Sequence, residues 1–98
     1  MKADIKEYHP NGELKHKIIF HPNGCKKYEQ YYNEKGTLHR INAPANQYWY
    51  GNGIKKYEVY RINGKCHNIS NPSRIFYSRF GKIKSNVYEI NGGWFLIN

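Results

Sequence analysis

The stretch 48–64, YWYGNGIKKYEVYRING, contains two short units that each run from an aromatic residue to a glycine four positions later. The same spacing precedes five other glycines. Five of the seven glycines follow asparagine, and Asn-Gly is a strong hairpin signal because both residues tolerate positive φ. We therefore expect seven tight turns with an aromatic at the same site of each hairpin, stacked across strands as a core column. The column residues are Tyr8, Phe20, Tyr32, Trp49, Tyr60, Tyr77 and Tyr88.

A longer period lies above this short one. Gly36, Gly64 and Gly92 follow one another at intervals of 28 residues. The chain thus divides into short repeats over residues 5–36 and two 28-residue repeats, 37–64 and 65–92. Glycine or proline interrupts every candidate helical window. The sequence predicts one all-β domain over residues 1–98, an elongated, twisted antiparallel meander of seven or eight short strands built from hairpin repeats.

The composition supports a sheet and indicates a class of partner. Aromatic residues make up 16% of the chain, and 16 Lys and Arg against 7 Asp and Glu give a formal net charge of +9. This balance favours acidic partners such as nucleic acid, anionic lipid or an acidic protein surface, although it also serves solubility. No signal-peptide or membrane-span pattern is visible, and two cysteines suit a reducing compartment, so we expect a cytoplasmic protein.

The repeat units resemble a known family. Tyr60-Arg61-Ile62-Asn63-Gly64-Lys65, and Gly36-Thr37-Leu38-His39-Arg40 followed by Ala43-Pro44-Ala45, are similar to MORN-variant repeats of the subtype found in bacteriophage and giant-virus proteins. The resemblance spans residues 5–95. It implies an elongated antiparallel sheet used as an interaction surface, with protein partners and sometimes phospholipids. Ala43 and Asn71 depart from the subtype's usual glycine.

Basic residues recur at fixed distances from the turns. Lys15, Lys27, Lys56 and Lys84 each lie three residues after a turn glycine, so a stacked meander would align them in one positive stripe that could bind phosphates. The alternative is a solvated face whose lysines protect strand edges. The remaining candidate binding cations are Lys26, Lys55, Arg61, Arg74 and Arg79.

Aromatic residues outside the column are the better binding candidates. Tyr28, Tyr50 and Tyr57 lead this group, with Tyr31 and Phe80 beside them. Such rings can stack on bases of single-stranded nucleic acid or anchor a protein interface.

Other site chemistries have little support. The five histidines lack the close pairing of zinc ligands, so no metal site and no cofactor are predicted. Cys25 and Cys66 align with apolar residues of sister units and are interpreted as packed. Glu29 and Glu58 each lie beside a lysine pair, which favours ion pairing, and no catalytic motif is present, so no enzyme activity is expected.

The sequence thus predicts a non-catalytic binding module. Our first hypothesis is a small viral or phage accessory protein that binds and inhibits a host protein complex, in the host cytoplasm, through a basic, tyrosine-rich face. The alternative is direct binding of single-stranded RNA or DNA. A membrane-surface role ranks last because no amphipathic helix or lipidation motif is present. Homo-oligomers could form through open sheet edges, which the apolar segment 94–97 could instead cover.

Overall fold

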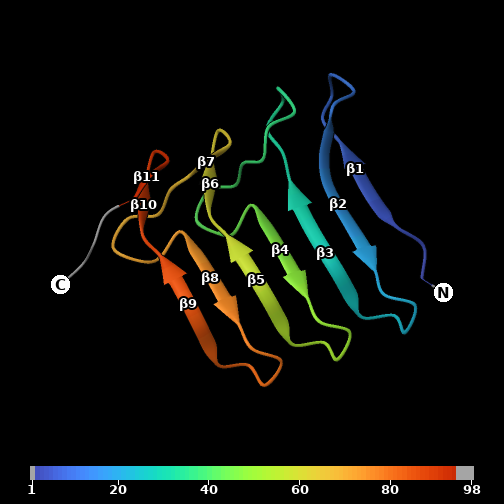
Figure 1. The fold of residues 1–98 in the computed structure, drawn as a ribbon. Helices are drawn as coiled ribbons and strands as arrows, with labels where there is room; N and C mark the ends of the chain where they lie inside the picture. The colour runs from blue at the N-terminus through green and yellow to red at the C-terminus, as the bar shows by residue number, and fades with distance from the viewer. Residues whose placement is uncertain (1, 95–98) are drawn as a thin grey trace.

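The computed structural model describes residues 2–94 and confirms the all-β prediction: these residues form strands and connecting turns without a helix. Seven strands make one antiparallel sheet in the order β1-β2-β3-β4-β5-β8-β9, and two small ribbons, β6-β7 and β10-β11, project from it (Figure 1). No helix able to span a bilayer occurs in this part of the chain. Residues 95–97 of the apolar segment lie outside the described residues. The strands are β1 (Ile5–Tyr8), β2 (Leu14–Phe20), β3 (Lys26–Tyr31), β4 (Asn46–Trp49), β5 (Lys55–Val59), β6 (Arg61–Ile62), β7 (Lys65–Cys66), β8 (Arg74–Tyr77), β9 (Ile83–Val87), β10 (Glu89–Ile90) and β11 (Gly93–Trp94).

All seven repeat glycines adopt positive φ, between 83° and 91°. In five turns the glycine N–H donates to the carbonyl three residues earlier, as in Gly53 to Tyr50. The other two turns are two-residue loops in which the asparagine is also left-handed, with φ 48° at Asn63 and 51° at Asn91. Low-cost positive φ explains the glycine of every turn and the asparagine of these two. At Asn11, Asn23 and Asn52 the side-chain Oδ1 instead accepts the N–H two residues later.

Consecutive turns along the meander alternate between the two ends of the strands. The turns at Gly24, Gly53 and Gly81 lie along the lower edge in Figure 1, and those at Gly12, Gly36, Gly64 and Gly92 along the upper edge. Neighbouring turns on one edge are hydrogen-bonded: Asn23 Nδ2 donates to Gly51 O at 2.6 Å, and Asn52 Nδ2 donates to Arg79 O at 3.1 Å. The 28-residue period is therefore one step along an edge.

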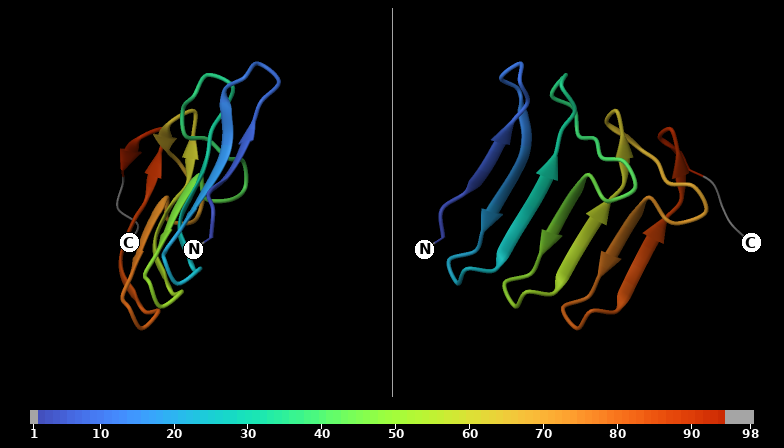
Figure 2. Two further views of the ribbon diagram at one scale, coloured as in Figure 1. Left: turned by 90° about the vertical axis from the view of Figure 1, so that its right-hand side faces the viewer. Right: turned by 180° about the vertical axis from the view of Figure 1, so that it is seen from behind.

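The molecule is a single layer (Figure 2), and its principal dimensions are 45 × 37 × 15 Å. Among the described residues only Ile18, Ala45, Val59 and Cys66 are buried apolar side chains, fewer than the buried polar ones. Strand register places Tyr28, Tyr48, Tyr57 and Phe76 in one row on the face that we call the aromatic face. Glu29, Gln47 and Glu58, each adjacent in sequence to a residue of that row, form a second row on the opposite, carboxylate face, and His16 lies on this face diagonally across from Glu29. Because no second layer covers the sheet, its side chains find their packing and hydrogen-bond partners mainly on neighbouring strands.

Candidate binding site: an aromatic–lysine groove

The aromatic face carries a ladder of rings from four neighbouring strands. The centroids of Tyr28 and Tyr48 are 5.9 Å apart, those of Tyr48 and Tyr57 5.7 Å, and those of Tyr57 and Phe76 4.2 Å. The last two pairs are stacked, with interplanar angles of 18° and 22°. Cross-strand aromatic pairs of this kind stabilise a sheet beyond the area that they bury. The ladder therefore stabilises the sheet, and the ring edges that point away from the sheet form part of its surface.

A shallow groove of about 380 Å³ lies over the end of this ladder. Four of its lining residues, Tyr50, Tyr57, Lys56 and Lys84, are among those predicted from the sequence. Three others, Tyr48, Phe76 and Tyr77, were not predicted as binding residues. Their signal was present in the sequence, since Tyr48 and Phe76 are separated by one 28-residue period. We call these seven residues the aromatic–lysine groove.

The groove lysines owe their position to β-bulges. Tyr48 pairs with Tyr57 and Trp49 with Lys55, so Lys56 is the extra residue between two register partners. The β1-β2, β2-β3 and β8-β9 hairpins have the same register shift, and their extra residues are Lys15, Lys27 and Lys84. A bulge locally bends the strand and re-aims the side chain. All four lysines are exposed.

Cations lie close to tyrosine rings both in the groove and beside it. Lys56 Nζ is 5.7 Å and the Arg79 guanidinium 5.6 Å from the Tyr50 ring centroid, and Lys17 Nζ is 5.3 Å from that of Tyr28. These are cation–π distances, at which the ring orients the cation while leaving its charge available to a partner. The groove and its margin thus combine fixed rings with exposed positive charge.

The predicted stripe of four lysines is not continuous. Lys27, Lys56 and Lys84 follow turns of the lower edge, whereas Lys15 follows a turn of the upper edge (Figure 1). The prediction of one row that includes Lys15 is therefore wrong, because successive turns alternate between edges. Lys27 precedes Tyr28 in β3 and so lies at the β3 end of the ladder.

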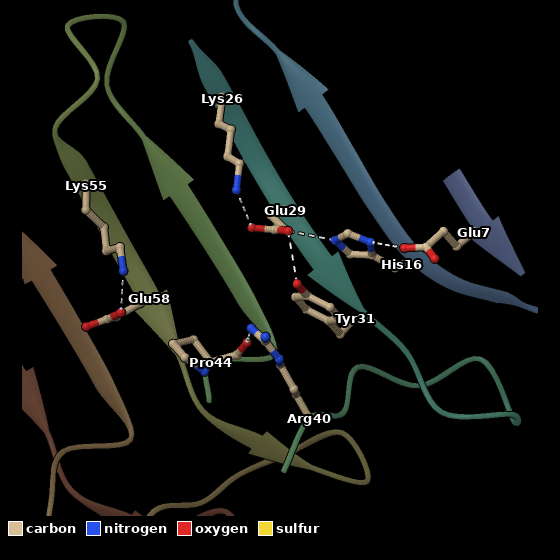
Figure 3. Close-up of polar contacts among 9 residues, drawn as sticks. All are labelled: Glu7, His16, Lys26, Glu29, Tyr31, Arg40, Pro44, Lys55 and Glu58. Atoms are coloured by element: carbon tan, nitrogen blue, oxygen red, sulfur yellow. Dashed lines mark hydrogen bonds and ion pairs between the residues drawn. The ribbon is translucent and has the colours of Figure 1, made fainter. Parts of the chain in front are cut away.

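Two other predicted lysines belong to the carboxylate face (Figure 3). Lys26 Nζ is 3.0 Å from Glu29 Oε1, and Lys55 Nζ is 2.9 Å from Glu58 Oε2. Both ammonium groups also approach the Trp49 ring, at 5.3 and 5.9 Å from its centroid. The predicted ion pairing of Glu29 and Glu58 is confirmed, and it holds these two lysines in internal contacts.

Glu29 is the centre of a charged network on this face (Figure 3). His16 lies between two carboxylates, with Nδ1 2.7 Å from Glu7 Oε1 and Nε2 2.7 Å from Glu29 Oε2. The imidazolium form satisfies both contacts as a donor. Burial alone would raise the pKa of Glu29, but hydrogen bonds from His16, Lys26 and Tyr31 outweigh it and lower the pKa below its ordinary value of 4.5.

Two of the three predicted arginines are held in contacts within the molecule, and one is exposed. Arg74 Nε donates to the buried Glu89 at 2.8 Å, and Arg61 donates to Asn46 Oδ1 at 3.1 Å and to Gly64 O at 3.0 Å. These contacts tie each ribbon to the main sheet, β10 to β8 through Arg74 and β6 to β4 through Arg61. Arg79 is exposed beside Tyr50 and stays available to a partner.

The column of aromatics four residues before the turn glycines is not the stacked core that the sequence predicted. Tyr8 is 59% exposed, and Phe20, Tyr32, Trp49, Tyr60 and Tyr77 are only half-buried. Stacking occurs instead in the ladder, and Tyr31 stacks on His16 on the other face at 4.2 Å. Most column residues lie where a strand enters its turn, and Tyr60 and Tyr88 lie just before the ribbon strands β6 and β10, so the column is divided between both edges and does not form one row.

Histidines and cysteines have structural positions. His9 Nε2 donates to Tyr32 O at 2.9 Å and His21 Nε2 to Trp49 O at 3.0 Å, while His39 Nδ1 accepts from Asn63 N at 2.9 Å. Each contact links neighbouring turns of one edge. Within residues 2–94 no three His, Cys, Asp or Glu side chains are arranged so that they could hold a metal ion. Cys66 is buried and Cys25 half-buried.

Comparison of the chain with family models, with curated proteins and with solved structures finds no match in any of the three.

Proposed function

We propose that this chain is a non-catalytic protein-binding module whose aromatic–lysine groove docks an acidic surface of a partner protein. The observation that carries the proposal is the orientation of the ladder rings. Tyr57 stacks between Tyr48 and Phe76, and Tyr48 lies between Tyr28 and Tyr57. Both flat faces of Tyr57, and one face each of Tyr48 and Phe76, are thus covered by other rings of the same molecule.

Covered ring faces favour a protein over a nucleic acid. Binding of single strands requires open aromatic faces on which bases stack. Here the partner meets ring edges, hydroxyl groups and exposed lysines, a combination that is enriched at protein interfaces. The high positive charge then steers an acidic partner to the groove. Together with the resemblance to viral MORN-type repeats, this supports an accessory protein that binds and inhibits a host protein complex.

Fluorescence anisotropy tests the proposal with two labelled probes of equal negative charge, an acidic peptide that contains aromatic residues and a single-stranded oligonucleotide. The groove variant is Lys56→Glu/Lys84→Glu. The matched control is Lys35→Glu/Lys65→Glu, which changes the net charge equally at exposed positions of the upper-edge turns. At about 150 mM salt, we expect the groove variant to weaken peptide binding about tenfold and the control to have little effect.

Two results would contradict this function. Equal weakening by both variants would indicate generic charge attraction. Tighter binding of the oligonucleotide that persists at this salt concentration would support the nucleic-acid alternative. Capture from a host lysate extends the test, because a stoichiometric host protein should be retained by the wild type and the control variant and lost with the groove variant.

A further inference from the structure

The strand β9 lies at an open edge of the sheet and is the repeat equivalent of β5. Each residue of β9 follows its β5 counterpart by 28 positions. β5 is paired on both sides, with β4 and β8, and its last two residues are buried. β9 pairs with β8 alone among the described strands, and its first four residues are exposed. Within residues 2–94, no strand therefore covers on β9 the surface that β8 covers on β5.

The turn before β9 differs from the other lower-edge turns in a way that fits a docking edge. Asn23 and Asn52 each reach the next turn with a hydrogen bond, but the equivalent residue of the last turn is Phe80, which is 87% exposed. Ser78 Oγ accepts the N–H groups of Phe80 and Lys82 within this turn. Thus Phe80 is not needed to close the turn. Beside it Ile83 is 58% exposed.

Charge and register define what such an edge would accept. No acidic residue occurs between Glu58 and Glu89, while six basic residues do: Arg61, Lys65, Arg74, Arg79, Lys82 and Lys84. Lys84 lines the groove on the aromatic face, whereas Ile83, the register partner of Tyr77, lies on the carboxylate face. An added strand presents successive side chains to opposite faces. A complementary strand would therefore alternate acidic residues toward Lys84 with apolar residues toward Ile83 and Phe80.

A second copy of this chain fits the edge less well. The seven strands alternate in direction, so β1 and β9 run the same way. If both copies turn their aromatic faces to the same side, β1 against β9 can form only a parallel pair, and an antiparallel pair requires β9 against β9 about a two-fold axis. That arrangement places Lys82 and Lys84 of both copies along one seam, where like charges repel.

We propose that the β9 edge, from Phe80 to Val87, binds an extended segment of a partner protein by antiparallel strand addition, and that acidic and apolar residues alternate in this segment. Main-chain hydrogen bonds would supply affinity, and Lys84, Ile83 and Phe80 would supply selectivity. The inference rests on the proposed function for the acidic character of the partner and adds the mode and place of attachment.

The test uses the whole protein and a capped peptide, Glu-Val-Glu-Ile-Glu-Val-Glu. Anisotropy measures affinity, and hydrogen exchange followed by NMR measures protection of the β9 amides. We expect added protection at alternate amides of residues 83–87, because only every second N–H of an edge strand faces outward. Phe80→Ser/Ile83→Thr should weaken binding about tenfold. The matched control, Ile5→Thr/Tyr8→Ser, removes one isoleucine and one aromatic ring from the β1 edge and should leave binding unchanged.

The outcomes separate this inference from the proposed function. Binding that is lost in Lys56→Glu without protection of β9 would overturn strand addition and leave the groove function standing. Protection of β9 that Lys56→Glu does not affect would support strand addition and contradict the groove. Absence of binding at millimolar peptide, or equal binding of a peptide whose valines are replaced by proline, would overturn the inference. A doubled solution mass with β9 protected before peptide is added would also overturn it.

Discussion

At the scale of single residues, this protein buries charged side chains as well as apolar ones. Glu29, Glu58 and Glu89 are buried, and each is paired with a Lys or Arg side chain: Lys26, Lys55 and Arg74 respectively. No buried side-chain nitrogen or oxygen in the described residues lacks a hydrogen-bond partner. Removing one member of such a pair leaves a charge without compensation, which costs more than the intact pair contributes.

The network around Glu29 makes stability depend on pH in the acid range. Its pKa is lower in the folded protein than the ordinary 4.5, so its contribution is complete above about pH 4.5 and is lost as the pH falls through the folded value. We expect Glu29→Gln to flatten the acid decline of the free energy of unfolding, measured by urea denaturation between pH 7 and pH 3. At neutral pH this variant should lose about 2 kcal/mol, less than a fully buried pair because Lys26 is 43% exposed.

Glu34→Gln is the control, because Glu34 is exposed. Its acid decline should match that of the wild type. A steep decline retained in Glu29→Gln would show that other carboxyl groups determine acid stability.

The two cysteines should differ in reactivity. Burial raises the pKa of the Cys66 thiol, with a smaller opposing effect of Arg61, and Cys66 is 9% exposed. Because the thiolate is the reactive form, iodoacetamide should modify the half-buried Cys25 first and Cys66 only after unfolding. Mass spectrometry of the native and urea-unfolded protein measures both rates. Equal native rates would contradict the packed position of Cys66.

At the scale of elements, the turn glycine is the feature that the local sequence specifies best. Gly53 has φ +86°, and a Cβ there would meet Cys25 Sγ only at an ordinary 3.8 Å. Gly53→Ala should therefore destabilise through backbone strain alone, by about 1 kcal/mol. Gly51→Ala in the same turn has open space and no positive φ, so it should be neutral or slightly stabilising. Thermal unfolding of both variants measures the difference, and equal losses would contradict the role of φ.

Hairpin features could be predicted from the sequence because they depend on residues close together in the chain. The turns, the antiparallel meander and the regular position of Lys27, Lys56 and Lys84 all follow from the distance to a glycine. The edge on which a turn lies does not follow from that distance. For this reason the sequence prediction placed Lys15 in one row with Lys27, Lys56 and Lys84. The ring ladder was missed for a related reason, since Tyr28 and Tyr48 pair through the register of strands in different hairpins.

At the scale of the whole molecule, a single layer changes what an aromatic residue does. With no second layer over the sheet, a ring is covered mainly by rings on neighbouring strands, and the groove is the rim of the same ladder that holds the strands together. The residue types of the candidate site could be predicted from the sequence. Its boundaries could not, because ion pairs on the carboxylate face engage Lys26 and Lys55.

The ladder should therefore determine the cooperativity of the sheet. Tyr57 joins β4 to β8 through its two ring contacts, so Tyr57→Ala should destabilise by about 2 kcal/mol, less than the truncation of a fully buried ring. It should also lower the urea m-value, because the two halves of the sheet would unfold less cooperatively. Tyr57→Phe retains the ring and should keep the wild-type m-value, while Tyr8→Ala removes a ring that is 59% exposed and should have little effect. If Tyr57→Ala and Tyr8→Ala shift the transition equally, the rings act individually. A loss confined to Tyr57→Ala would show that one continuous ladder couples the strands of the thin sheet.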